Sequence, residues 1–235
     1  MADSEKVQDV PPLPGGSLSE AQRGTITLVL ELLAIERASV SSVVDERAWL
    51  VHVADSLTGL EVPALREAGR IADIGSGAGF PGLVLAVALP DSQVDLIESV
   101  GRKCNFMRRA IEAAAIANAN VLNARSEEIA AAAGRDAYDA VTARAVGRLS
   151  TLAELASPLL HDHGVLVAWK GRRDEDEEAQ LQRAAESLAM DPEQILDVGD
   201  RAGSKHRHLH VLRKVGTTPP DLPRRSGMAK KRPRG

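Results

Sequence analysis

A glycine-dense turn between two apolar runs is the segment of this chain best suited to hold a ligand. Residues 71–74 form a short apolar run that contains Asp73, and the glycine-rich residues 75–79 follow directly. Glycines permit positive φ angles and let a ligand approach the backbone closely. Pro81 suits the first turn of a helix, where its missing N–H is no loss. The pattern predicts a strand, a tight loop and a helix, which is how α/β folds hold nucleotide-like cofactors.

The glycine spacing indicates which cofactor would fit. Gly75, Gly77 and Gly79 form a G-x-G-x-G pattern, whereas the dinucleotide fingerprint is G-x-G-x-x-G and places a pyrophosphate at a helix N-terminus. Asp73 would repel a pyrophosphate, so the pattern argues against an NAD-dependent oxidoreductase. An acid there suits a cationic amino-acid ligand, which favours S-adenosylmethionine with its sulfonium and α-ammonium groups. The alternative is a glycine-rich turn that binds nothing.

Three polar residues after further strand candidates would extend the same ligand site. Glu98 ends the second candidate strand, about 25 residues beyond Asp73, and a carboxylate there can accept both ribose hydroxyls. Its alternative role is that of a helix N-cap. Ser126 and Glu127 follow the third candidate strand, where backbone and carboxylate would contact an adenine. Their alternative role is helix capping alone.

Two cations follow the next two candidate strands. Arg144 comes after residues 138–142 in a mostly apolar segment, and Lys170 directly follows the run 163–169. Ligands bind beyond the carboxyl ends of strands in such sheets, so both are candidates for positioning a substrate or contacting phosphate. A salt bridge from Arg144 to Asp73 or Glu127 is the alternative. We assign no certain catalytic residue.

Strands alternate with helices from residue 70 onward. The candidate strands are residues 70–74, 93–98, 119–123, 138–142, 163–169 and 206–214. The candidate helices are residues 82–89, 101–117, 126–133, 150–160 and 174–190. This order predicts an α/β fold with a Rossmann-like, doubly wound and mostly parallel sheet. The last candidate strand alternates in part, as an antiparallel edge strand would.

The chain divides into four segments. We expect residues 1–16 to be a disordered lead, 17–69 a helical appendage, 70–215 the α/β domain and 216–235 a basic tail. Ser17 and Glu20 resemble a capping box that opens a first helix, which ends near Arg37. A second helix is expected after Asp45, with Trp49, Leu50, Val53 and Leu57 forming an apolar stripe.

Charge is distributed unevenly along the chain. The net charge is −4, but residues 219–235 contain six basic side chains and one acid. The basic residues are Arg224, Arg225, Lys230, Lys231, Arg232 and Arg234. An acidic body with a basic tail suggests a polyanionic partner. A solvated, disordered tail is the alternative.

Composition narrows the class further. Hydrophobic residues make up 44% and aromatic residues 2%, which predicts an aliphatic, alanine-rich core. Cys104 is the single cysteine, so no intramolecular disulfide can form and a reducing cytoplasm is expected. It is better read as a small helix residue than as a nucleophile. Neither a membrane span nor a signal peptide is evident.

Two clusters invite a metal interpretation that we do not favour. His206, His208 and His210 alternate along one strand candidate, but histidines with this period among basic residues are more typical of an exposed edge. The acidic run 174–178 is better placed to open a helix, because it complements the helix dipole. We therefore predict no metal.

Several motifs together resemble the RsmG (glucose-inhibited division protein B) family. They are D-I-G-S-G-A-G-F-P-G at 73–82, I-E-S-x-G-R-K at 97–103, A-R-S-E-E at 124–128, T-A-R-A-V at 142–146, W-K-G at 169–171 and the tail P-R-R-x-G-x-x-x-K-x-P at 223–233. The resemblance covers about residues 18–233. It departs in the appendage, where residues 39–42 and 51–56 replace an Asn-Leu-Thr segment and an R-H-x-L-D-S motif, and the arginine is missing.

The resemblance implies a bacterial class I methyltransferase of 16S ribosomal RNA. Such enzymes transfer a methyl group from S-adenosylmethionine to N7 of one guanine in the 530 loop. By motif, Gly75 and Phe80 line the cofactor, Ser126 and Glu127 meet its adenine side, and Arg144 lies at the methyl end.

The expected partner is therefore 16S ribosomal RNA in the 30S subunit, with no DNA or membrane. Lys170, Arg224, Arg225, Lys230 and Lys231 are the candidate RNA contacts. A methyltransferase of a protein or small molecule is the alternative enzyme, and a catalytically silent RNA-binding protein is the alternative outside enzymes.

Overall fold

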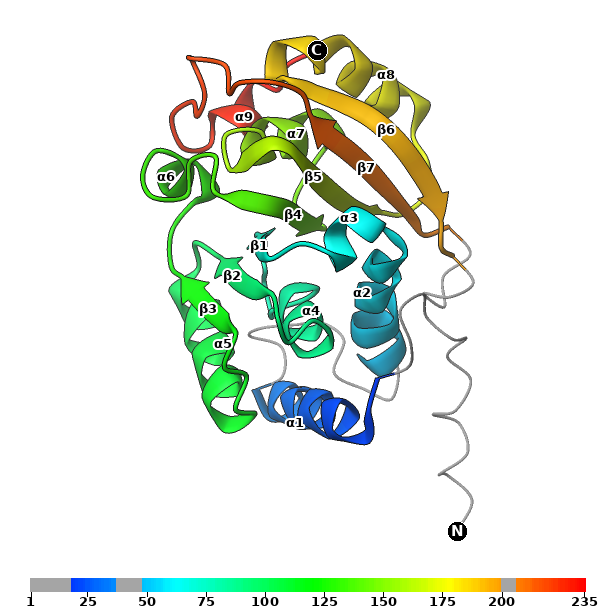
Figure 1. Ribbon diagram of the computed structural model, residues 1–235, viewed down its shortest axis with the longest axis vertical. Helices are drawn as coiled ribbons and strands as arrows, with labels where there is room; N and C mark the ends of the chain where they lie inside the picture. The colour runs from blue at the N-terminus through cyan, green and yellow to red at the C-terminus, as the bar shows by residue number, and fades with distance from the viewer. Residues whose placement is uncertain (1–17, 37–47, 200–205) are drawn as a thin grey trace.

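A seven-stranded sheet runs through the centre of the protein, with helices on both faces (Figure 1). The computed structural model describes residues 18–36, 48–199 and 206–235. The strand order is β3-β2-β1-β4-β5-β7-β6. Strands β1 to β5 pair in parallel, and β7 runs antiparallel to both β5 and β6. The predicted doubly wound, mostly parallel α/β architecture is confirmed.

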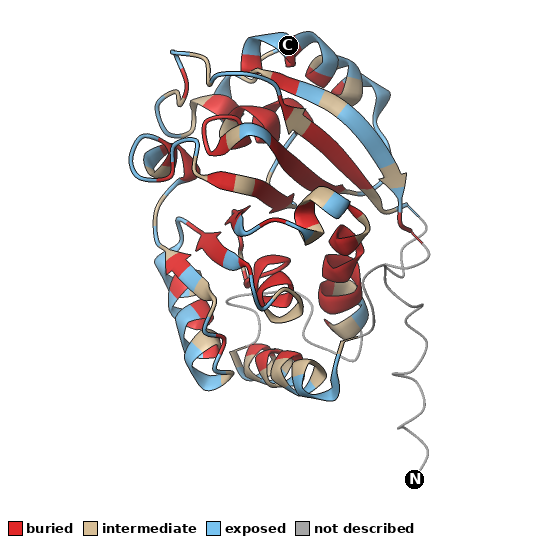
Figure 2. Cartoon of the chain, viewed as in Figure 1, coloured by how far each residue is buried: buried red, intermediate tan, exposed pale blue. Residues whose placement is uncertain are grey.

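The first five predicted strands are all present. They are β1 (Arg70–Ile74), β2 (Gln93–Ile97), β3 (Ala119–Leu122), β4 (Tyr138–Arg144) and β5 (Leu160–Lys170). Most residues of β1, β2 and β4 are buried, as expected of parallel strands that helices cover on both faces (Figure 2). The carboxyl ends of β1, β2 and β4 therefore meet at one edge of the sheet.

The antiparallel end of the sheet differs from the prediction. β7 (His208–Lys214) is an antiparallel strand, but it lies between β5 and β6 and is not the edge. The edge is β6 (Met190–Asp197), which the sequence did not reveal. The helix predicted over 174–190 is shorter, with α8 at Glu175–Ala184 and a 3₁₀ turn at Glu186–Leu188. Ala189 then takes a left-handed conformation, with φ +52°, which ends the helical path.

Two sets of helices cover the sheet. On one face lie α4 (Gly82–Ala88), α5 (Gly101–Ala113) and the N-terminal helices (Figure 1). On the other lie α6 (Ser126–Ala130), α7 (Leu149–Ala156), α8 and α9 (Met228–Lys231). The predicted helices 82–89, 101–117, 126–133 and 150–160 are confirmed, although each ends one to four residues earlier. A hydrophobic cluster fills each face of the sheet.

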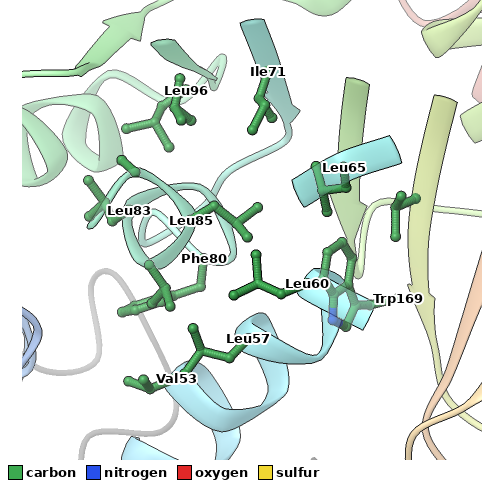
Figure 3. Packing of buried hydrophobic residues seen from close by; sticks show 14 of the residues in the cluster. Val53, Leu57, Leu60, Leu65, Ile71, Phe80, Leu83, Leu85, Leu96 and Trp169 are labelled. Carbon is green, nitrogen blue, oxygen red and sulfur yellow. The ribbon is translucent and has the colours of Figure 1, made fainter. Parts of the chain in front are cut away.

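The N-terminal helices share a core with the α/β domain. They comprise α1 (Glu20–Glu36), a π-helical turn (Trp49–Ala54), α2 (Asp55–Leu57), a 3₁₀ turn (Thr58–Glu61) and α3 (Pro63–Arg66). Val53 and Leu57 pack toward Phe80 and Leu83 of the glycine loop and α4 (Figure 3). Leu50 belongs to the apolar stripe predicted from the sequence, but it is 40% exposed. This shared core joins the appendage to the glycine loop.

Helix α1 begins with a capping box two residues later than predicted. The Gln22 side chain accepts from the backbone N–H of Ser19, and the Gln22 N–H donates to the Ser19 hydroxyl at 3.2 Å. Ser17 lies outside the described residues, as do the predicted lead at 1–16, the divergent segment 39–42 and the helix start after Asp45. In the described part of the chain, no helix has the length and apolar character to span a membrane.

Candidate cofactor site

Hydrogen bonds join the glycine loop to the neighbouring strand β2. The N–H groups of Gly75 and Ser76 donate to the Ile97 carbonyl at 2.8 and 3.2 Å. Gly75 has a φ of +64°, and a Cβ atom there would lie 2.7 Å from Cγ2 of Val146. Both the conformation and the close approach require glycine. The predicted strand, tight loop and helix are confirmed.

A cavity of about 430 Å³ opens at the carboxyl ends of β1 and β2. Its lining combines four of the predicted cofactor residues, which are Gly75, Glu98, Ser126 and Glu127. The sequence did not indicate Val146, Thr151, Leu155, Gly227 or Ala229, which also line it. The volume falls within the range of about 300–1,000 Å³ that is typical of small-molecule sites.

Glu98 presents a carboxylate at this cavity. Its Oε2 accepts from the N–H of Gly77 at 3.0 Å, and its Oε1 accepts from the N–H of Val100 at 2.8 Å. Val100 is the N-cap of α5, so the alternative of Glu98 as that N-cap residue is wrong. Each carboxylate oxygen can accept a further hydrogen bond, which leaves capacity for a pair of hydroxyls.

Ser126 and Glu127 also line this cavity. Arg125 is the N-cap of α6, and Ser126 is its first residue, so Ser126 does not cap this helix. The Ser126 hydroxyl donates to Oε2 of Glu127 at 3.3 Å. Oε1 of Glu127 accepts from the N–H of Gly227 at 2.6 Å. One oxygen of Glu127 thus holds the C-terminal segment, and the other faces Ser126.

Asp73 is fully buried and lies outside the lining of this cavity. Its Oδ1 accepts from the Thr142 hydroxyl at 2.8 Å, and its Oδ2 accepts from the N–H of Gly82 at 3.2 Å. Burial raises the pKa of Asp73 from 3.8 to about 6, although these hydrogen bonds act in the opposite direction. The carboxylate therefore joins β1 to β4 and to the start of α4.

Arg144 bridges the end of β4 and the N-terminal helices. Its Nη1 lies 2.8 Å from Oδ2 of Asp55 and 2.9 Å from the carbonyl of Val51. The predicted alternative, a salt bridge from Arg144 to Asp73 or Glu127, is therefore wrong. Arg144 does form a salt bridge, but its partner is Asp55 of the N-terminal helices. Asp55 is 1% exposed and also pairs with Arg207 at 2.7 Å.

Phe80 is part of the same junction. Its ring stacks on His52 with centroids 4.5 Å apart, and the Arg144 guanidinium carbon lies 5.8 Å from the ring centroid. Gly77, Phe80 and Arg144 lie outside the lining of the cavity, although Gly77 bonds to Glu98 within it. The predicted cofactor residues therefore fall into two groups. Gly75, Glu98, Ser126 and Glu127 line the cavity, whereas Phe80 and Arg144 lie where the α/β domain meets the N-terminal helices.

Lys170 is held by the helix that follows it. Its Nζ lies 2.6 Å from Oε1 of Glu177 and 3.0 Å from the carbonyl of Gly147. Glu177 also accepts from the N–H of Leu149, so it ties α8 to α7. Asp174 is the N-cap of α8 and accepts from the N–H of Glu177, which confirms that the acidic run opens a helix.

The C-terminal tail is folded against the α/β domain, so the alternative of a solvated, disordered tail is wrong. Arg224 makes a two-point ion pair with the buried Glu154, at 2.6 and 2.5 Å. The Thr151 hydroxyl donates to the carbonyl of Ala229 at 3.3 Å. Lys230 and Lys231 line the cavity and are exposed, and Arg225 is exposed but lies outside the lining. The tail therefore supplies cations to the cavity mouth.

The three alternating histidines occupy different surroundings. His206 is exposed, whereas His210 is 3% exposed, and burial lowers its pKa to about 4. Cys104 is buried in α5, with its Sγ 3.1 Å from the carbonyl of Glu98. It is enclosed by the core, as predicted for a small helix residue.

Solved structures with similar architecture show the fold class of this chain. A SAM-dependent methyltransferase from Aquifex aeolicus has a TM-score of 0.55 and 18% identity, over 73% of this chain and 94% of that one. The fibrillarin pre-rRNA processing protein of Methanococcus jannaschii has a TM-score of 0.55 and 16% identity, over 70% of this chain and 74% of that one. The chain has the class I methyltransferase fold.

The sequence comparisons identify the family. The model of rRNA small subunit methyltransferase G, the GidB family, matches residues 35–209. The protein of that name from Rubrobacter xylanophilus is 41% identical over 223 residues, which are 91% of this chain and 85% of that one. The one from Bacillus subtilis is 31% identical and covers 93% of both chains. This chain belongs to the rRNA small subunit methyltransferase G family, which its motifs predicted.

Proposed function

We propose that this protein transfers a methyl group from S-adenosylmethionine to N7 of a guanine in the 530 loop of 16S ribosomal RNA. The observation that carries the proposal is the cavity at the carboxyl ends of β1 and β2, where the glycine loop and Glu98 meet. Membership of the family supports the same reaction. The proposed partner is the cytoplasmic 30S subunit.

The residues of the cavity fit the cofactor. Glu98 has acceptor capacity for the two ribose hydroxyls, and Gly75 lets the loop lie against Val146 of the cavity lining, where a Cβ atom would clash. Ser126 and Glu127 would face the adenine, as the family motif implies. When bound, S-adenosylmethionine supplies an electrophilic methyl group on its sulfonium.

The buried position of Asp73 changes its proposed role. Both of its oxygens already accept from Thr142 and Gly82, so it acts on the cofactor through the shape and charge of the glycine loop. Phe80 and Gly77 would act in the same indirect way, since Phe80 stacks on His52 and Gly77 donates to Glu98.

The reaction requires the protein to position the reacting groups and needs no general base. Guanine N7 carries an in-plane lone pair and no proton, so it can attack the methyl group directly. Rate then comes from holding N7 in line with the sulfonium methyl. Arg144 is proposed to order this side of the site, because its contacts with Asp55 and Val51 join β4 to the helices above it.

The RNA contacts proposed from the sequence now fall into two groups. Arg225, Lys230 and Lys231 are exposed, and the two lysines stand at the cavity mouth, where they can meet phosphate. Arg224 and Lys170 instead pair with Glu154 and Glu177. We therefore propose that the first group contacts RNA and that the second group shapes the surface that does so.

The proposed function is tested by transfer of labelled methyl from S-adenosylmethionine to 30S subunits that lack this modification, followed by primer-based mapping of the site. Labelling of one guanine in the 530 loop is the expected result. A protein that binds S-adenosylmethionine but leaves the 30S subunit unlabelled would contradict the RNA assignment and favour a protein or small-molecule substrate.

A further inference from the structure

The C-terminal segment forms one wall of the cavity, on the side of Glu127. Gly227, Ala229, Lys230 and Lys231 all line it. They share the cavity with Glu98 and the glycine loop, which lie more than 100 residues earlier in the chain. A segment that serves only to meet RNA phosphates would not need to form part of this wall.

Specific bonds hold this segment in place from both ends. Before it, Arg224 is bound to the buried Glu154 of α7 at 2.6 and 2.5 Å and also donates to the Arg232 carbonyl at 2.8 Å. Within it, the N–H of Gly227 donates to Glu127 at 2.6 Å, and the carbonyl of Ala229 accepts from Thr151 at 3.3 Å. Bonds at several points, of which the Thr151–Ala229 bond is buried, position a wall more accurately than a solvated tail could.

The backbone of the segment also departs from ordinary helix geometry where it meets Glu127. Gly227 has a φ of +82°, a left-handed conformation that glycine adopts without strain. Its N–H thereby reaches a carboxylate 100 positions earlier in the sequence. Ala229, two residues later, is 2% exposed although it lies near the surface of the domain.

We propose that residues 227–231 are part of the cofactor-binding site and close its adenosine end. The inference rests on the proposed function, because it takes the cavity as the place where S-adenosylmethionine binds. The segment sets the position of Glu127 through Gly227 and limits the depth of the cavity through Ala229. The adenosine part of the cofactor, not the RNA alone, is thus what this end of the chain recognises.

Two variants test the proposal by calorimetric titration with S-adenosylmethionine in the absence of RNA. Ala229→Leu either fills part of the cavity or displaces its wall, and removal of residues 227–235 takes the wall away. We expect each to weaken binding by about tenfold or more, which corresponds to the loss of one or two buried contacts. Circular dichroism and thermal melting check that both variants are folded.

Arg234→Ala is the matched control. It removes a tail cation that bonds to the Ser187 carbonyl and pairs with Asp221, outside the cavity lining. Its dissociation constant for the cofactor should equal that of the wild type. If Ala229→Leu and the truncated protein also bind as tightly as the wild type, the tail is not part of the cofactor site.

Glu98→Ala separates this inference from the proposed site itself. Loss of cofactor binding in Glu98→Ala together with unchanged binding in both tail variants would overturn the inference and leave the cavity assignment intact. Unchanged binding in Glu98→Ala would overturn the cavity assignment, and the inference with it. Weakened binding in all three variants supports both.

Discussion

The guanidinium of Arg144 and the carboxylate of Asp55 form an ion pair with an Nη1–Oδ2 distance of 2.8 Å. The two residues are 89 positions apart, and their side chains are only 13% and 1% exposed. Asp55 also pairs with Arg207, and its backbone carbonyl accepts from Nε1 of Trp169 at 2.8 Å. One buried acid thus connects the N-terminal helices to β4, β5 and the segment before β7.

Asp55→Ala should lower the free energy of unfolding by about 3 kcal/mol, because it leaves Arg144 and Arg207 without their buried partner. Urea unfolding at neutral pH measures the change. Glu193→Ala is the control, since it breaks an ion pair with Arg213 that is about one-third exposed or more on both sides. That exposed pair should contribute less than about 1 kcal/mol. Equal losses in the two variants would contradict the central role of Asp55.

Arg144→Ala should lower the rate of methyl transfer by about a hundredfold, because misplacement of reacting groups by an ångström has an effect of this size. Binding of S-adenosylmethionine should persist, since Arg144 lies outside the cavity lining. Single-turnover transfer to 30S subunits and calorimetric titration measure the two quantities separately. An unchanged transfer rate in Arg144→Ala would contradict the positioning role. Loss of S-adenosylmethionine binding would mean that Arg144 belongs to the cofactor site.

Stability should depend on the ionisation of Asp73. Burial raises its pKa in the folded state from 3.8 to about 6, so the folded state holds the proton more tightly than the unfolded chain. Ionisation of Asp73 therefore lowers the free energy of unfolding progressively as pH rises from about 4 to above 6. The free energy of unfolding of the wild type, relative to Asp73→Asn, should fall by about 3 kcal/mol across this range. A difference that does not change with pH would mean that Asp73 titrates alike in both states.

Neighbouring arginines of the tail should behave differently. Arg225 is exposed, so Arg225→Ala should reduce the salt dependence of 30S binding by about one phosphate contact and leave stability unchanged. Arg224→Ala leaves Glu154 buried without its partner and should lower the free energy of unfolding by about 2 kcal/mol. Filter binding over a salt series and urea unfolding separate the two effects. A loss of stability in Arg225→Ala together with a changed salt dependence in Arg224→Ala would contradict the proposal that Arg225 contacts RNA and Arg224 holds the tail.

The parts of the fold that the sequence predicted are those with a local signal. Each parallel strand is a short apolar run that ends near glycine or a polar residue, and the rule that ligands bind at the carboxyl ends of strands brought Gly75, Glu98, Ser126 and Glu127 to one cavity. Strand β6 has no such signal, because Pro192 interrupts it and most of its side chains are exposed at an edge.

Partners distant in sequence could not be predicted. For Arg144 the sequence offers a salt bridge to Asp73 or Glu127 only as the alternative, whereas the packing of the N-terminal helices brings Asp55 within 2.8 Å of it. The place of the tail was likewise hidden, since basic composition indicates a polyanionic partner and says nothing of Gly227 meeting Glu127 across 100 residues. The position of Asp73 at a strand end is a local signal and predicts a ligand contact, whereas its burial depends on α4 and β4.

The wall contributed by residues 227–231 also determines when, during synthesis, the cavity can exist. The glycine loop, Glu98 and Glu127 leave the ribosome before the wall that Glu127 contacts, because Gly227 lies 100 positions after Glu127 in the chain. A nascent chain that has already formed β1 to β5 still lacks it. The cavity is therefore complete only when residue 231 has left the ribosome that makes the chain.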